Sequence, residues 1–228
     1  MIKAILFDID NTLMDFMKMK HECCKAAIDA MISAGLKTNQ EKGLEVLYKL
    51  YDKYGLEYQY IFRNLLRELG GKVDYRIISH GIIAYRKMRD SYLIPYPDVI
   101  STLIELKKNY KLAVVSDAPV LQAWMRLVTM RLDGFFDVVI TKADARKQKT
   151  HAAPFKAALR ELKIKSEEAV MIGDRISRDV ETAKKLGIKT IYARYGDTHK
   201  AEVGKSGADA EIERVSEIIG VLEKWGKF

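Results

Sequence analysis

The chain has 228 residues, of which 48% are hydrophobic and 31% are charged; these ordinary globular values exclude disorder as the default state. Its formal net charge of +8 attracts anionic partners, but basic and acidic residues alternate along the chain, so composition argues against nucleic-acid binding. No apolar run approaches the roughly 20 residues of a membrane span, and Asp8 follows the N-terminus too early for a secretory signal. We therefore expect a cytoplasmic protein without membrane association.

The content of amides and cysteines adds two expectations. The chain has only four Asn and four Gln residues, whereas Lys and Glu are plentiful. This composition favours a thermophilic source. The two cysteines, Cys23 and Cys24, are adjacent. Neighbouring cysteines rarely bridge each other, and two cysteines alone do not make a zinc framework. We interpret them as reduced thiols on a helix.

Short apolar runs without alternation indicate strands that are buried on both faces. They occupy residues 2–7, 112–115, 136–140, 169–172 and 190–193, with a last short strand at Ile212. Helical patterns follow at residues 97–108, 119–131, 155–162, 180–186 and 215–225. This alternation predicts an α/β fold, in which a parallel sheet carries helices on both faces.

One connection is much longer than a crossover needs. Residues 18–92 lack a strong strand signal and predict four helices, at about 18–34, 40–54, 57–69 and 74–90, with breaks at Gly35, Gly55 and Gly70. We expect a core domain made of residues 1–16 and 93–228 and an inserted helical domain at residues 17–92. The linkers should lie near residues 14–17 and 92–96.

Ligands of a parallel sheet bind beyond the carboxyl ends of its strands, and the residues at these ends are mostly acids. Asp8, Asp10, Ser116, Asp117, Gly173, Asp174 and Asp179 stand there. So much negative charge in one place needs a cation, and oxygen ligands suit Mg²⁺. Asp8 and Asp10 suit a nucleophile with an acid/base, and Ser116 suits an anion site at a helix N-terminus. If each of these residues is considered alone, the alternative interpretations are solvent-exposed acids and a helix cap.

These residues resemble the motifs of the haloacid dehalogenase (HAD) superfamily. The string D-I-D-N-T-L at residues 8–13 matches its D-x-D-x-T signature, and Ser116 resembles its second motif. The string G-D-R-I-S-R-D at residues 173–179 resembles its fourth motif, and Lys149, six residues before Phe155, resembles its third. Thr150 and Ala152 replace the prolines usual after this lysine, so we expect Lys149 to be less rigidly held. Lys142 and Lys147 are the other candidates.

The resemblance implies a Rossmann-like core and a phosphatase-type member with a helical cap. It implies that Asp8 is the nucleophile, that Asp10 is the acid/base, and that Mg²⁺ is held by Asp8, Asp174 and the backbone carbonyl of Asp10. Ser116, Asp117 and Lys149 would bind phosphate, with Thr12 and Asp179 in support. The implied activity is hydrolysis of a small phosphorylated metabolite through an aspartyl-phosphate, by a monomer or homodimer.

Asp10 argues against a dehalogenase, because dehalogenating members of the superfamily lack this second acid. Two alternatives stay open beside the phosphatase. A phosphomutase uses the same nucleophile but needs sugar-phosphate contacts from the cap. A catalytically weak regulatory or binding protein could keep the fold, and the altered lysine loop is its best support.

Overall fold

The computed structural model describes residues 1–198 and 201–226, and the chain in it forms two units. The first unit is Met1–Phe16 with Ile94–Phe228, and the second is Met17–Leu93. The expected linkers lay at residues 14–17 and 92–96, next to these two boundaries. Each unit is described by itself below.

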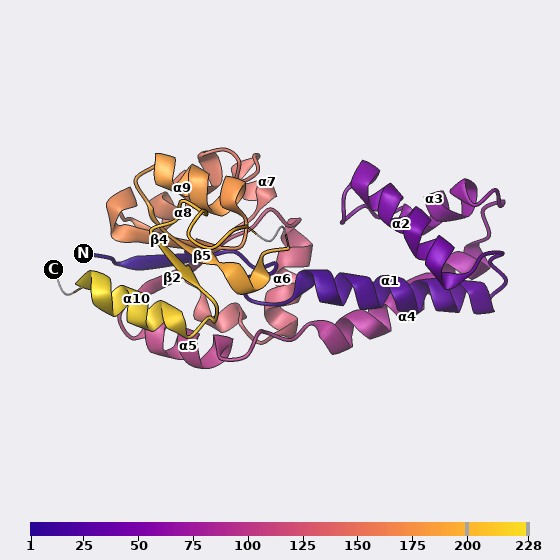
Figure 1. Cartoon of the computed structure of the whole chain (residues 1–228), viewed down its shortest axis with the longest axis horizontal. Coiled ribbons are helices and arrows are strands. Elements are labelled where there is room, and N and C mark those ends of the chain that lie inside the picture. The colour runs from indigo at the N-terminus through magenta and orange to yellow at the C-terminus, as the bar shows by residue number, and fades with distance from the viewer. Residues whose placement is uncertain (199–200, 227–228) are drawn as a thin grey trace. The chain divides into compact units, whose positions relative to one another are not determined.

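Six parallel strands make the sheet of the first unit, as the alternation of elements predicted (Figure 1). They are β1 (Ala4–Phe7), β2 (Lys111–Val115), β3 (Val138–Ile140), β4 (Ala169–Gly173), β5 (Lys189–Ala193) and β6 (Ala210–Ile212). Their order is β3-β2-β1-β4-β5-β6, and all neighbours are parallel. From β1, the chain adds β2 and β3 on one side and then β4, β5 and β6 on the other. The strand order therefore reverses beside β1, and such a switch point is where ligands of parallel sheets bind.

The register of the central strands aligns their carboxyl ends. Phe7 of β1 lies opposite Val114 of β2 and Ile172 of β4. Every residue of β1 and β4 is buried, as expected for strands covered on both faces. Residues that come after Phe7, Val115 and Gly173 are therefore brought to one edge of the sheet.

Helices cover both faces of this sheet (Figure 1). The α-helices are α5 (Val99–Lys107), α6 (Val120–Thr129), α7 (Lys142–Ala145), α8 (Ala153–Leu162), α9 (Glu181–Lys185) and α10 (Glu217–Gly226). The short helical turns are η1 (Asp133–Phe135), η2 (Ser166–Glu168), η3 (Ile176–Val180) and η4 (Arg194–Gly196). On one face, Phe155 and Leu159 of α8 pack with Leu6 and Met171 of the strands. The helix expected at residues 180–186 is α9, and the π-helical turn η3 directly precedes it.

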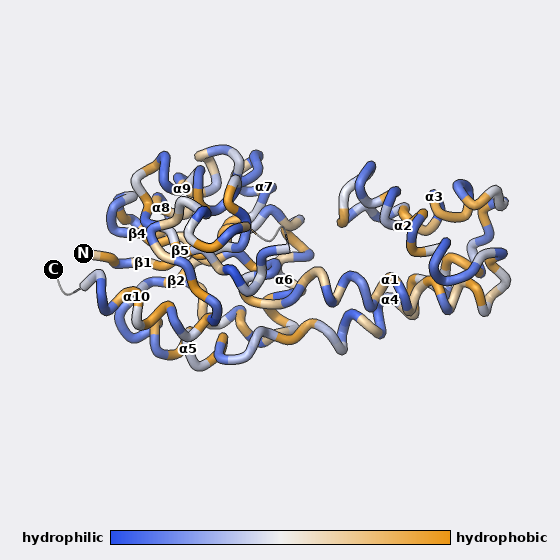
Figure 2. The backbone as a smooth tube through the Cα atoms, viewed as in Figure 1, coloured by the Kyte–Doolittle hydropathy of each residue, from blue (hydrophilic) through white to orange (hydrophobic). Residues whose placement is uncertain are grey.

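The second unit contains α2 (Gln40–Tyr54), α3 (Ile61–Glu68), α4 (Tyr75–Tyr92) and all of α1 (Phe16–Ser33) except its first residue. These bounds agree with the four expected helices within a few residues. Figure 2 shows apolar and polar residues interleaved along them, as amphipathic helices require. Their apolar faces share one core, in which Met31, Leu47 and Leu65 are completely buried. The helices pack closely at Gly81, where a Cβ atom would lie 2.7 Å from the Met31 side chain.

Cys23 and Cys24 lie on α1 with free, buried thiols, as the sequence predicted. Burial raises the pKa of Cys23 to about 12 and that of Cys24 to about 11. Both sulfurs are therefore held as unreactive thiols at neutral pH. Among the described residues, no helix combines the length and the apolar character that a membrane crossing needs.

Candidate active site

Asp8 is the first residue after β1, at the aligned edge of the sheet. Its backbone N–H continues the strand ladder by donating to the carbonyl of Ile172 at 2.9 Å. The residue is only 6% exposed. The sheet itself therefore fixes the backbone of Asp8, which is what a nucleophile at a defined place requires.

A tight turn follows Asp8, and residues of η4 contact it and hold it in place. Asn11 adopts a left-handed φ of 59°, a conformation that asparagine tolerates better than most residues. The Tyr195 hydroxyl donates to the carbonyl of Thr12 at 2.8 Å. Gly196 packs so closely that a Cβ atom there would lie 1.6 Å from the carbonyl oxygen of Asn11. The β5–β6 connection therefore holds the turn, a contact that only a glycine at residue 196 permits.

Lys149 lies at the centre of the site. Its side chain is 2% exposed, and Nζ lies 2.6 Å from Oδ1 of Asp179 and 2.7 Å from Oδ1 of Asp8. Burial lowers the pKa of Lys149, but the carboxylates of Asp179, Asp8 and Asp117 outweigh that effect, and the pKa is raised overall. The lysine is therefore a permanent cation beside Asp8.

The backbone of Lys149 is also anchored, so the expectation of a loosely held lysine is not matched by its contacts. The Lys149 N–H donates to Oδ1 of Asp117 at 2.8 Å. The other oxygen of Asp117 accepts from Nη1 of Arg178 at 3.1 Å. This carboxylate supplies the restraint that proline gives in the usual motif. Lys142 and Lys147, the alternative lysines, are both exposed on the segment that precedes it.

Asp174 follows β4 and is 1% exposed. Neither of its carboxylate oxygens has a hydrogen-bond partner within residues 1–198 and 201–226. Burial raises its pKa to about 8, and the charges of Asp8 and Asp179 add to the shift. A buried carboxylate without donors is unfavourable unless a cation compensates it.

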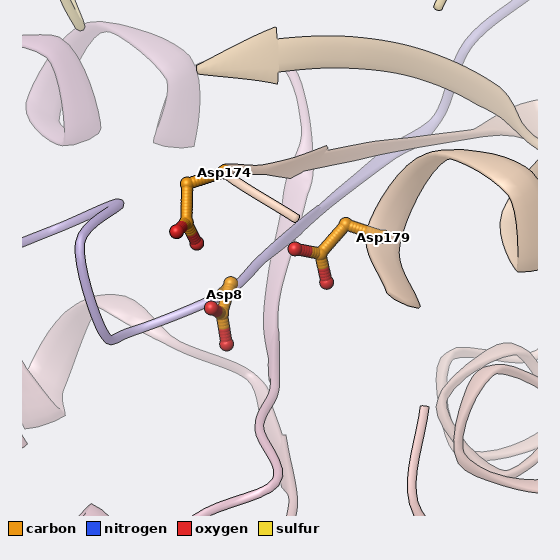
Figure 3. A group of neighbouring side chains, drawn as sticks. All are labelled: Asp8, Asp174 and Asp179. Carbon is orange, nitrogen blue, oxygen red and sulfur yellow. The ribbon is translucent and has the colours of Figure 1, made fainter. Parts of the chain in front are cut away.

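Figure 3 shows the carboxylates of Asp8, Asp174 and Asp179 converging from β1, β4 and η3. One oxygen from each lies within 4.8 Å of the others. Both oxygens of Asp179 are engaged, Oδ1 by Lys149 and Oδ2 by the N–H of Arg175. Lys149 engages only Oδ1 of Asp8, so Asp8 and Asp174 are the side chains best placed to hold a metal. Two buried, hard oxygen donors fit a cation such as Mg²⁺, which usually takes one or two carboxylates and completes its shell with water and substrate oxygens.

Gly173 makes the approach of Asp179 possible. A Cβ atom on Gly173 would lie 2.3 Å from Oδ2 of Asp179. The same Oδ2 accepts from the N–H of Arg175 at 3.0 Å. Burial raises the pKa of Asp179, while Lys149 opposes the shift. The glycine is therefore required for packing against the carboxylate that holds the lysine.

Ser116 and Asp117 follow β2 at the same edge. The Ser116 N–H donates to the carbonyl of Ile140 at 2.9 Å, and its hydroxyl accepts from the Ala118 N–H at 3.1 Å. That second bond is a local turn contact and not a helix cap, because α6 begins only at Val120 and its N-cap is Pro119, without a side-chain cap bond. The carboxylate of Asp117 is engaged by Lys149 and Arg178, so only its backbone N–H suits an anion. Phosphate binding by these two residues stays a prediction.

Thr12 and Asp10 complete the predicted set. The Thr12 hydroxyl is buried and has no hydrogen-bond partner among the residues described. Asp10 forms an ion pair that the sequence analysis did not foresee: Nη1 of Arg126, on α6, lies 3.1 Å from its Oδ2. The sequence holds a signal for Arg126 as an inward-facing polar residue. It is three residues after Ala123 and next to Leu127, on the apolar stripe of its helix.

Comparison with known proteins agrees with this geometry. Residues 5–193 match the family of haloacid dehalogenase-like hydrolases. The chain is 34% identical over its whole length to a glyceraldehyde 3-phosphate phosphatase of Methanocaldococcus jannaschii, which it covers completely. It is 33% identical to that of Pyrococcus furiosus, with 98% of this chain and 94% of that protein covered.

A solved structure shares the fold over nearly the same length. The HAD phosphatase of Thermococcus onnurineus superposes with a TM-score of 0.71 at 26% identity, over 97% of this chain and 98% of that one. The extent of these matches, together with the motif residues that meet at one sheet edge, shows that the chain belongs to the haloacid dehalogenase-like hydrolase family.

Proposed function

We propose that the protein is a Mg²⁺-dependent phosphatase that hydrolyses a small phosphorylated metabolite through an aspartyl-phosphate on Asp8. The observation that carries the proposal is the position of Asp8 between the cation of Lys149 and the donor-free carboxylate of Asp174. The names of the similar proteins support glyceraldehyde 3-phosphate as the first substrate to assay.

In the first step, a carboxylate oxygen of Asp8 attacks phosphorus while the ester P–O bond breaks. Asp10 gives its proton to the departing oxygen, so an alcohol leaves and Asp10 becomes a carboxylate. Lys149 provides a fixed positive charge beside Asp8. This charge offsets the repulsion between the Asp8 carboxylate and the incoming phosphate. Dividing the reaction at a covalent intermediate replaces one high barrier by two lower ones.

In the second step, the carboxylate of Asp10 takes a proton from a water molecule as its oxygen attacks phosphorus. The bond between Asp8 and phosphorus breaks, which releases inorganic phosphate and restores both aspartates. Positioning and charge neutralisation provide most of the catalysis in phosphoryl transfer. The hydrogen bonds that fix Asp8, the turn after it and Lys149 supply the positioning.

Asp8 and Asp174, with the backbone carbonyl of Asp10, would hold Mg²⁺. The ion, when bound, supplies positive charge that offsets the phosphoryl oxygens. The backbone N–H of Asp117 and the hydroxyl of Ser116 are the further groups that we propose for the phosphate. Thr12 supports the turn that carries Asp10.

We propose that the helical unit, residues 17–93, acts as the cap that selects the substrate. Its own core allows it to move as one body. It joins the first unit at residues 16–17 and 93–94, so two short connections would have to absorb any closure.

The decisive test is phosphate release from a panel of phosphorylated metabolites that includes glyceraldehyde 3-phosphate, with Mg²⁺ and with excess EDTA. We expect Mg²⁺-dependent release from at least one compound and none from Asp8→Asn. Activity in EDTA would contradict the metal site. Label moving from one sugar phosphate to another without net phosphate release would instead show a phosphomutase.

A further inference from the structure

Arg126 is buried on a helix that exposes apolar side chains. It lies on α6 and is 5% exposed, alongside the completely buried Ala123 and Leu127. On the same helix, Leu121 is 68% exposed and Val128 is 55% exposed. Burying a guanidinium opposes the usual distribution of residues, because arginine is mostly exposed unless it is paired. Such a conflict between local chemistry and fold is most often found where a residue serves function.

The contacts of Arg126 lie beside the turn of the nucleophile. Nη1 donates to Oδ2 of Asp10 at 3.1 Å. The guanidinium carbon lies 4.7 Å from the ring centroid of Phe16, the first residue of α1. The planar group is therefore held by an aromatic face and by the rigid helix α6, and it presents an N–H to the Asp10 carboxylate.

Asp10 needs an anchor of this kind. Its backbone is in the turn after β1, and its side chain is 26% exposed, compared with 8% for that of Asp8. Proton transfer requires this carboxylate within hydrogen-bond reach of the reacting oxygen. A bond from a buried guanidinium to Oδ2 restricts the rotamers of the Asp10 side chain.

We propose that Arg126 is a positioning residue that fixes the Asp10 carboxylate for proton transfer to the leaving oxygen and from the attacking water. The inference rests on the proposed function, because it takes Asp10 to be the acid/base of a phosphatase. Arg126 acts through Asp10 and not on the phosphate. Its removal should therefore matter only where Asp10 matters.

The test is a double-mutant cycle between Arg126→Met and Asp10→Asn, measured with an alkyl phosphate that the wild type hydrolyses. Arg126→Met should lower kcat at least about tenfold, within the range of general acid–base effects. In the Asp10→Asn background, Arg126→Met should lower kcat less than about twofold, because the effects of substituting two residues that act as a unit do not add. Equal losses in both backgrounds, or an unchanged kcat in the single variant, would overturn the assignment.

Leaving-group dependence provides a second readout. With p-nitrophenyl phosphate, whose leaving group needs little protonation, Arg126→Met should keep a rapid first turnover and slow only the later ones. Arg126→Lys, which keeps a cation, should recover part of the activity on the alkyl phosphate. If the Met variant does not fold, the Lys variant still tests the proposal. A Lys variant as inactive as Met, although folded, would contradict the proposal.

Two controls separate this result from others. Arg160→Met removes an arginine that is 75% exposed on α8 and should leave kcat unchanged. Mg²⁺ affinity of Arg126→Met, measured calorimetrically, should match the wild type, because Arg126 bonds to the side chain of Asp10 and not to the backbone carbonyl that we propose for the metal. Absence of phosphatase activity in the wild type would defeat the proposed function itself, whereas an active wild type with additive losses would defeat only the role of Arg126.

Discussion

The Nζ atom of Lys149 lies 2.6 Å from Oδ1 of Asp179, and both side chains are almost completely buried. A second bond holds Asp179 itself, from the N–H of Arg175. Asp179 is therefore held by two groups, and Asp174 is the acid that we propose for the metal. The two acids of the fourth motif therefore have different surroundings, although both are buried: Asp174 follows β4, and Asp179 is in η3.

Replacing Asp179 with asparagine should reveal this division. The change keeps the shape of the side chain but removes the charge that holds Lys149, so kcat/KM should fall at least about tenfold. Mg²⁺ affinity, measured by calorimetry, should fall less than in Asp174→Asn. Mg²⁺ binding lost to the same extent in both variants would instead make Asp179 a metal ligand.

Gly173→Ala should disable the site through sterics alone. The new methyl group would lie 2.3 Å from Oδ2 of Asp179, so the carboxylate must move away from Lys149. We expect kcat to fall by about a hundredfold, comparable to the loss of one electrostatic group in an active site.

Gly220→Ala is the matched control for that prediction. Gly220 is on α10, where a Cβ atom would have no neighbour within 4 Å, and alanine favours a helix. Activity should be unchanged and stability equal or higher. A Gly173→Ala variant as active as this control would show that Asp179 can shift without consequence.

The raised pKa of Asp174 predicts how Mg²⁺ stabilises the protein at different pH values. An aspartate in the unfolded chain loses its proton near pH 4, whereas the pKa of Asp174 in the fold is about 8. Between these values the native state holds the extra proton, so this residue lowers the free energy of unfolding as the pH rises. Mg²⁺ must displace that proton to bind.

The rise in Tm on adding Mg²⁺ should therefore be small at about pH 6 and larger at about pH 9, by scanning calorimetry. Asp174→Asn should abolish the rise at both values, and Asp52→Asn, a change at an exposed residue, should leave it intact. A rise in Tm that is equal at both pH values would mean that Asp174 is already ionised in the metal-free protein.

The strands and the acids could be predicted from sequence because each depends on a local signal. Buried runs such as residues 169–172 are continuous and apolar, and the parallel order then places the residues after each run at one edge. Arg126 and Asp10 are 116 residues apart, and no local rule pairs them. The periodicity of α6 does mark Arg126 as a polar residue on an inward face, but it names no partner.

The contacts of Lys149 could not be predicted from its loop for a related reason. Proline is a local restraint that a sequence shows directly, so Thr150 and Ala152 suggested a looser Lys149. The restraint in the fold comes instead from Asp117, 32 residues earlier, which accepts from the Lys149 N–H at 2.8 Å. A tertiary hydrogen bond of this kind has no signature within the loop.

This anchoring gives a further prediction. Asp117→Ala should raise KM for the phosphorylated substrate several-fold, because the Lys149 backbone loses its acceptor and Arg178 its partner. Thr150→Pro with Ala152→Pro in the wild type should change little, since the loop is already held. The same prolines added to Asp117→Ala should recover part of the loss, and steady-state kinetics on the four proteins would show it.

The roles of Asp8 and Asp10 can be separated in time. In the proposed mechanism Asp8 makes the covalent bond, so Asp8→Asn should remove turnover with every substrate. Asp10 acts first as acid and then as base, and p-nitrophenyl phosphate hardly needs the acid. Asp10→Asn should therefore release about one p-nitrophenol per active site in a burst and then turn over slowly, because the aspartyl-phosphate accumulates without its base. An alkyl phosphate should give no burst, since its leaving oxygen needs the proton. Equal and complete loss on both substrates would restrict Asp10 to the metal site, and a burst from Asp8→Asn would exclude Asp8 as the nucleophile.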